Sequence, residues 1–115
     1  QESFVRSFST GAKIMFGGMS DHYRVPLRDF SPEGNYGRET VYYDTTRHSS
    51  EIYADAAVRF IDNYSNERPF FMLVSFQAPH DPRDMPEEYL DMYAAEAIDL
   101  PPNVMPRHPF DNGEL

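Results

Sequence analysis

The sequence contains no cysteine, and none of its apolar runs is long. Without cysteine the chain can form no disulfide, no thiolate metal site and no cysteine nucleophile. A helix that spans a bilayer needs about 20 apolar residues in succession, and no run approaches that length. No secretory signal peptide is visible either. We therefore expect no membrane partner and no thiol chemistry.

Basic residues are also few, because ten of them stand against 19 acidic residues and give a formal net charge of −9. Proteins bind nucleic-acid backbones through clustered Lys and Arg, and the arginines here are scattered. This composition argues against a nucleic-acid partner. The ten prolines make the chain loop-rich, and it begins with Gln1 and stops at Leu115 without a recognisable ending. We expect a piece of a larger protein.

The most apolar stretch runs from Phe70 to Phe76 and carries no charge. It does not alternate polar with apolar residues, which is typical of a strand buried on both faces inside a parallel sheet. Before it, apolar residues recur at helical spacing. We therefore predict an α/β fold in which a helix over residues 50–64 leads into a buried strand over residues 69–77. Ligands of open α/β sheets bind beyond the carboxyl ends of the strands, where His80 follows.

The remaining elements are predicted to be short. Helical turns are expected over 2–9, strands over 13–16, 23–28 and 40–44, a helix starting near Pro86, and irregular chain over 98–110. Pro26 places the second of these strands at a sheet edge, because proline cannot donate a backbone hydrogen bond. Ser49 or Ser50 is the expected N-cap of the 50–64 helix.

His80 is the main candidate for chemistry because it stands in the sequence Pro79-His80-Asp81-Pro82. The two prolines restrict the backbone on both sides and fix the direction of the imidazole, as a preorganised site requires. One alternative is a loop that only caps a sheet, with His80 bonded to a backbone carbonyl. Another is a metal site of His80, Asp81 and Asp84, although three neighbours on one tight loop rarely reach a single ion.

The other candidate residues carry weaker signals. His108 has the same proline bracketing and is a second candidate for substrate binding. Asp21 and His22 could bind a metal, but without further spaced ligands we interpret His22 as a surface histidine beside a carboxylate. Asp111-Asn112-Gly113 is typical of an ordinary turn. The sequence has no Gly-x-Ser-x-Gly elbow, phosphate-binding glycine loop or His-Glu-x-x-His pair.

The stretch from Pro69 to Pro82 resembles the central strand and the following Pro-His-x-Pro turn of the type I sulfatases. These enzymes belong to the alkaline-phosphatase-like superfamily. The pattern Ala-Asp-Ala-Ala-Val-Arg-Phe-Ile at 54–61 is similar to the sulfatase helix that leads into this strand. The tail over 99–114 resembles bacterial members of one sulfatase branch. The resemblance implies a place in the parallel-sheet sandwich of that superfamily, and it is weaker over 1–49.

The resemblance also implies a reaction. In sulfatases a formylglycine, made from the Cys or Ser of a Cys/Ser-x-Pro-x-Arg motif, attacks the sulfate ester. A calcium ion held by aspartates and an asparagine polarises the sulfate, and lysines and histidines bind the remaining oxygens. By its motif, His80 corresponds to one of these histidines and is expected near the bridging oxygen, where a donor offsets charge on the leaving alcohol. The expected substrate is a sulfated carbohydrate or another sulfate ester.

Several parts of the family pattern are absent from the chain. It lacks the Cys/Ser-x-Pro-x-Arg motif, the paired N-terminal aspartates, the Gly-Lys-Trp-His segment and the later Asp-His/Asn-Gly calcium motif. The resemblance therefore implies that residues 1–115 are a central fragment of a sulfatase catalytic domain. Within it we expect a loop-rich part over 1–49, a helix, strand and histidine turn over 50–83, and a short helix with a proline-rich tail over 84–115.

With the formylglycine and the calcium ligands outside this chain, the isolated chain is expected to be inactive. Two alternatives stay open: a phosphoesterase of the same superfamily, and a non-catalytic structural or binding segment. Phe70 to Phe76 should expose apolar surface on both faces, so the fragment is expected to self-associate. The resemblance implies a periplasmic or extracellular location.

Overall fold

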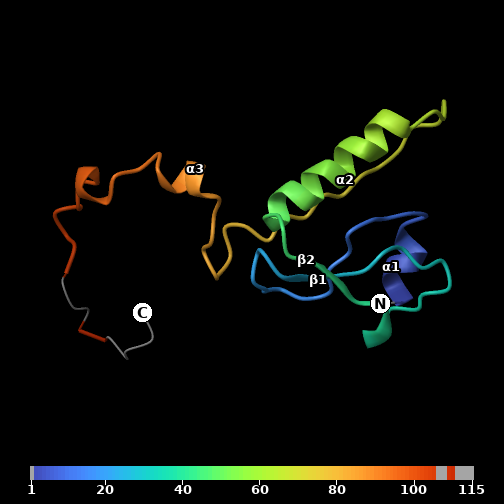
Figure 1. Cartoon of the computed structure of the whole chain (residues 1–115), viewed down its shortest axis with the longest axis horizontal. Helices are drawn as coiled ribbons and strands as arrows, with labels where there is room; N and C mark the ends of the chain where they lie inside the picture. The colour runs from blue at the N-terminus through green and yellow to red at the C-terminus, as the bar shows by residue number, and fades with distance from the viewer. Residues whose placement is uncertain (1, 106–108, 111–115) are drawn as a thin grey trace.

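A computed structural model of the chain describes residues 2–105, 109 and 110 (Figure 1). The elements follow in the order α1 (Glu2–Ser7), β1 (Val25–Leu27), the 3-10 turn η1 (Arg38–Thr40), β2 (Tyr42–Asp44), α2 (Ser49–Asn63), α3 (Glu87–Leu90) and the 3-10 turn η2 (Ala95–Ala97). Most of the described residues lie outside these elements. The expected mixture of helix, strand and much loop is therefore confirmed.

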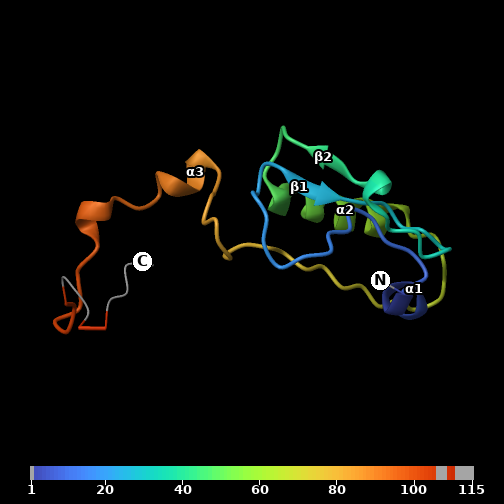
Figure 2. The same ribbon diagram turned by 90° about the horizontal axis from the view of Figure 1, so that it is seen from below.

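The chain divides into a folded body and an extended arm. α1, the two strands and α2 lie together, whereas α3 and the residues up to 105 extend away from them (Figures 1 and 2). The radius of gyration is 19.1 Å, compared with about 13 Å for a compact domain of this length. The arm buries little, because neither α3 nor η2 contains a buried residue.

β1 and β2 form a small antiparallel sheet, with Val25 opposite Asp44 and Leu27 opposite Tyr42. Pro26 lies in the middle of β1, and it is tolerated there because both strands of a two-stranded sheet are edges. The predicted strands over 23–28 and 40–44 are thus confirmed in shortened form. The strand predicted over 13–16 is reduced to one bridge, in which Ile14 and Arg28 exchange backbone hydrogen bonds of 2.7 and 2.8 Å.

The core lies where α2 packs against this sheet. Val25, Leu27 and Ile52 are fully buried and Tyr53 is nearly so. Met15 packs at the margin of this cluster. α2 buries only the residues near its N-terminus, and Figure 2 shows that part of the helix beneath the strands. The core therefore fixes the start of α2, which is the end nearest His80.

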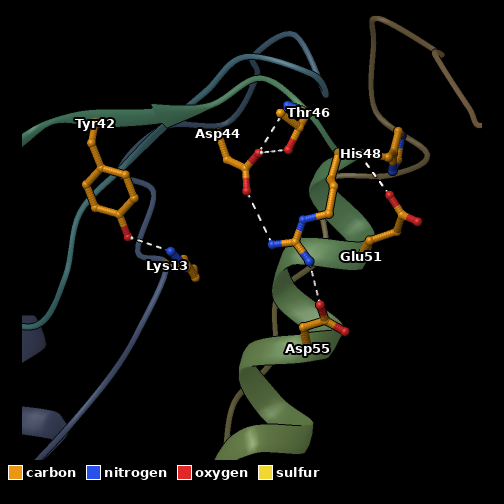
Figure 3. Close-up of polar contacts among 8 residues, drawn as sticks. Lys13, Tyr42, Asp44, Thr46, His48, Glu51 and Asp55 are labelled. Atoms are coloured by element: carbon orange, nitrogen blue, oxygen red, sulfur yellow. Dashed lines mark hydrogen bonds and ion pairs between the residues drawn. The ribbon is translucent and has the colours of Figure 1, made fainter.

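Polar contacts tie the sheet to its surroundings. The Lys13 ammonium donates to the Tyr42 hydroxyl at 3.1 Å (Figure 3). This hydroxyl in turn donates to Asp29 at 2.8 Å. Burial raises the pKa of Tyr42, and the Asp29 carboxylate raises it further. The phenol therefore stays protonated and keeps its role as a donor.

The connection from β2 to α2 is braced by Asp44, whose carboxylate accepts from the amide and hydroxyl of Thr46 (Figure 3). Arg47 donates to Asp44 and to Asp55 of α2, joining the two elements. The bonds from Thr46 and then the one from Arg47 lower the pKa of Asp44. The charged form of Asp44 is therefore the form that braces this connection.

α2 confirms the helix predicted over 50–64, but its N-cap differs from the prediction. The cap is His48, not a serine. The His48 ring accepts the Ser50 N–H at 3.2 Å, and the Glu51 carboxylate accepts the His48 N–H at 3.0 Å (Figure 3). These reciprocal bonds form a capping box, which satisfies donors that the first helical turn would leave unpaired.

The strand predicted over 69–77 is not formed among the described residues, whose only sheet is the antiparallel pair β1–β2. The segment is extended but has no strand partner, and Phe71 and Leu73 are 79% and 63% exposed. A strand exists only through hydrogen bonds to a neighbour, so apolar composition cannot form one alone. The prediction of burial is wrong for this chain, and the predicted exposure of apolar side chains is confirmed.

Other aromatic rings contact the start of this segment. Phe70 packs edge-on against Phe60 of α2, with ring centroids 5.2 Å apart. Phe71 stacks on Phe8 at 6.4 Å. The segment consequently lies along α2 and close to α1 (Figure 2), although Phe71 remains mostly exposed.

α1 agrees with the helical turns predicted over 2–9, and it carries the central ring of an aromatic cluster. Phe4 contacts the rings of Phe8, Phe16, Phe30 and Tyr36. Edge-to-face geometry, as between Phe4 and Phe16 at 88°, is the favoured arrangement of aromatic pairs.

No helix within the described residues is both long and apolar enough to cross a membrane.

Candidate active site

An open hollow of about 530 Å³ lies between the N-terminus of α2 and the turn that follows the apolar segment. We call residues 77–84 the histidine turn. The hollow is lined by His22, His48, Ser50, Glu51, Ala54, Phe76, Ala78, Pro79, His80, Arg83, Asp84, Met85, Pro86 and Tyr89. Three of the four histidines of the chain therefore meet at one place. Sequence reasoning selected only one of them as the main candidate.

The histidine turn is closed by a backbone hydrogen bond of 2.9 Å from the His80 N–H to the Gln77 carbonyl. The Ala78–Pro79 and Asp81–Pro82 peptide bonds are both cis. The prolines fix φ on either side of His80, as the sequence predicts. The backbone thus reverses direction at His80 and exposes its side chain.

The two nitrogens of the His80 ring differ in their hydrogen bonding among the described residues. Its Nδ1 lies 3.2 Å from the Asp81 carbonyl. A carbonyl can only accept, so Nδ1 carries the proton in the neutral ring. Within the described part of the chain, Nε2 has no hydrogen-bond partner. The ring can therefore accept a proton at Nε2 when neutral, or donate one from Nε2 when charged.

Charged side chains of both signs surround His80. Arg83 pairs with Asp81 through a 2.9 Å contact, and both side chains are exposed. Glu51 contributes a carboxylate on the helix side of the hollow. Exposed ion pairs of this kind are weakly bound, so Arg83 is available for an anionic group that enters the hollow.

The predicted alternative of a metal site at His80, Asp81 and Asp84 gains no support. Residues 2–105, 109 and 110 contain no group of three or more His, Cys, Asp or Glu side chains placed to hold a metal ion. Asp81 instead pairs with Arg83. Asp84 contributes its backbone carbonyl to a contact with His48.

His22 is a buried residue, so its interpretation as a surface histidine is wrong. It is 1% exposed, and its ring stacks on His48, which is 3% exposed, with centroids 4.6 Å apart and planes at 12°. We call these two residues the buried histidine pair. The neighbouring Asp21 caps a turn by accepting the Tyr23 N–H. The sequence carries no local signal for this burial, because it depends on how the 21–24 turn packs on α2.

His48 could have been found from the sequence. Glu51 stands at the N3 position relative to His48, and an acidic residue at that spacing is the second half of a capping box. Two serines directly after His48 gave a stronger compositional signal for the cap. His108, the second substrate-binding candidate, and Asp111-Asn112-Gly113 lie outside the described residues.

A second hollow, of about 510 Å³, lies on the other side of His80 and runs beneath the apolar segment. It is bounded by the chain around Gly11, by α2 and by residues 71–77. Gln77 also lines it, and the Gln77 Oε1 atom is buried without a hydrogen-bond partner among the described residues. His80 therefore lines both hollows.

The comparisons with known proteins agree on one family. A family model described as "Sulfatase" matches residues 12–105. A "Sulfatase" from Formosa agariphila is 33% identical over 63% of this chain and 15% of its own length. An "Arylsulfatase" from Clostridium perfringens is 35% identical over 55% of this chain and 13% of its own length. The comparison with solved structures found no match.

Proposed function

Since this chain belongs to the sulfatase family, we propose that it forms part of an enzyme that hydrolyses sulfate esters. The chain spans 15% and 13% of the lengths of the two relatives above, so it supplies only part of that enzyme's active site. The observation that carries the proposal is the exposed His80 ring, which a rigid turn holds beside an open hollow. Its Nε2 atom has no hydrogen-bond partner among the described residues.

His80 acts on the leaving group in this proposal. The charged ring keeps its Nδ1–H on the Asp81 carbonyl, which fixes the ring plane, and offers its Nε2–H to the bridging oxygen of the ester. A nucleophile supplied by another part of the enzyme bonds to the sulfur as the bond from sulfur to the bridging oxygen breaks. The electron pair goes to this oxygen, and the Nε2 proton neutralises the resulting alkoxide. The alcohol then leaves and His80 becomes neutral. The Arg83 guanidinium offers a second donor on the same hollow.

The calcium ion and the formylglycine of the family do not fit this chain. The described residues offer no ligand set for a metal, and the sequence holds neither a cysteine nor a Ser-x-Pro-x-Arg motif. We therefore assign both groups to parts of the enzyme outside this chain. The role of His80 given above requires neither of them to be held by these residues.

The substrate and location are proposed from the family resemblance. An open hollow lined by both polar and aromatic side chains suits a carbohydrate ring, so we propose a sulfated carbohydrate as substrate. Both relatives come from bacteria, which supports a bacterial enzyme. We propose that it acts in the periplasm or outside the cell.

The decisive experiment compares the full-length enzyme with the 115-residue chain on an aryl sulfate and the matching aryl phosphate. We expect the full-length enzyme to cleave the sulfate at least about 100-fold faster than the phosphate, because its site is built for the sulfate transition state. The 115-residue chain should release no alcohol above the buffer rate. Preference for the phosphate would identify a phosphoesterase, and turnover by the chain alone would refute the assignment of the nucleophile to other parts of the enzyme.

We also propose that the exposed apolar side chains of this segment make the isolated chain self-associate. Phe71 and Leu73 lie mostly in solvent and belong to an uncharged run, so burying them against a second copy is favourable. We expect the apparent mass in sedimentation velocity to rise with concentration.

The double variant Phe71→Lys, Leu73→Lys should shift this association to higher concentration by about tenfold or more, because charge opposes burial of the segment. Met92→Lys is the matched control, since Met92 is equally exposed but lies in the extended arm. A wild-type chain that stays monomeric at all concentrations would contradict the proposal.

A further inference from the structure

The buried histidine pair carries an inference that rests on the proposed function and extends it to residues that touch no substrate. Buried polar side chains in a core are costly unless every polar atom finds a partner. His22 and His48 are nearly inaccessible, and all four of their ring nitrogens have partners. The identities of these partners show what the pair does.

The hydrogen bonds assign the proton positions of His48. Its Nδ1 accepts the Ser50 N–H at 3.2 Å, so this nitrogen is unprotonated. Its Nε2 must then carry the proton, and it lies 3.1 Å from the Asp84 carbonyl, which can only accept. His48 therefore caps α2 with one nitrogen and binds the end of the histidine turn with the other.

His22 has the same arrangement. Its Nε2 lies 3.4 Å from the His80 carbonyl and so carries the proton, although this contact is at the long end of the hydrogen-bond range. Its Nδ1 then accepts the Ser49 hydroxyl at 2.7 Å. The Ser49 N–H in turn donates to the His22 carbonyl at 2.9 Å, which locks His22 onto the first residue of α2.

Both Nε2–H groups thus bind carbonyls of the histidine turn, at His80 and at Asp84, and both rings are anchored to the start of α2. Stacking keeps the two rings parallel, so their donors act as a rigid unit. We propose that His22 and His48 are positioning residues, which set the place of the His80 ring relative to the N-terminus of α2. They act through the backbone of the turn.

Two substitutions of His48 separate positioning from stability. Asn is a favoured N-cap residue and retains an acceptor for the helix, but it is too short to reach the Asp84 carbonyl. Gln reaches as far as the histidine Nε2 and retains a donor, but it is a poorer cap. If His48 acts only on stability, the activity of each variant should follow its midpoint of thermal unfolding. His48→Gln should then be both the less stable and the less active variant. If it positions His80, His48→Asn should be the worse enzyme while it is the more stable protein.

The test measures kcat/KM of the full-length enzyme for sulfate esters with good and poor leaving groups. A displaced His80 harms the ester that most needs a proton on its leaving oxygen. We expect His48→Asn, and likewise His22→Asn, to lower kcat/KM about tenfold for a poor leaving group and less than about threefold for a good one. His48→Gln should lower both by less than about threefold. Equal losses for both esters, or losses that follow the thermal midpoint, would overturn the proposal.

Hydrogen exchange provides a readout that does not depend on activity. In His22→Asn and His48→Asn the amides of residues 77–84 should exchange faster than in the wild type, whereas those of α2 should not, because its cap is kept. His80→Ala serves as the reference for the proposed function. If His80→Ala leaves activity unchanged, the role of His80 fails, and hydrogen exchange alone decides whether the pair holds the turn. Unchanged exchange over 77–84 would refute positioning whatever the kinetics show.

Discussion

Replacing His80 by alanine in the full-length enzyme is expected to lower kcat/KM for sulfate esters by about 100-fold or more, because a positioned proton donor contributes that much to leaving-group departure. Among the described residues the exposed ring forms one hydrogen bond, through Nδ1, so the substitution removes little packing. The loss should appear mainly in kcat, since the donor acts in the transition state.

The leaving group provides the internal check on this result. His80→Ala should be most harmful for alkyl sulfates, whose alkoxides need a proton, and less harmful for aryl sulfates with acidic phenols. Asp62→Asn, an exposed change on α2, is the control and should leave both rates unchanged. A loss below about threefold for the poorest leaving group would remove His80 from the chemical step.

Replacing Ile52 by alanine is expected to lower the free energy of unfolding by about 2–4 kcal/mol, because it leaves a cavity in a packed core. Ile52 is fully buried in one cluster with Val25 and Leu27, and with Tyr53 it packs α2 against the sheet. The same helix carries the cap and the anchors of the buried histidine pair, so the loss should reach the site as well as the fold.

Chemical denaturation of the full-length enzyme measures this effect. Arg59→Ala, on an exposed face of the same helix, is the matched control and should change the free energy of unfolding by less than about 0.5 kcal/mol. Similar losses for the two variants would mean that the Val25, Leu27 and Ile52 cluster is not the core that holds α2.

The sequence predicts elements whose stability is local. α2 was found because its apolar residues recur at the helical period, and the period needs no knowledge of the rest of the chain. The proline-braced turn at His80 was found for the same reason, since proline restricts its own backbone. The strand over 40–44 was predicted by its β-branched and aromatic content and the strand over 23–28 by its alternating apolar residues, each within a few residues of its bounds.

Features that depend on distant partners could not be predicted in this way. The segment 69–77 has the composition of a buried strand, but pairing needs a neighbour, and β1 and β2 pair with each other instead. His22 looks like a surface residue from its neighbours, yet its burial follows from Ser49, far along the chain. Both the pairing of segment 69–77 and the burial of His22 depend on residues far away in the sequence, and no local pattern encodes such contacts.

The residues that border the exposed apolar segment also affect aggregation of the chain before it has folded. An uncharged seven-residue run from Phe70 to Phe76 is the type of sequence that stacks into intermolecular cross-β structure. Arg68 and Pro69 precede it and Pro79 follows it. Charged residues and prolines at such borders act as gatekeepers, since they cannot extend a growing ladder. Pro79, which helps to fix the direction of His80, therefore also limits aggregation of this segment during synthesis.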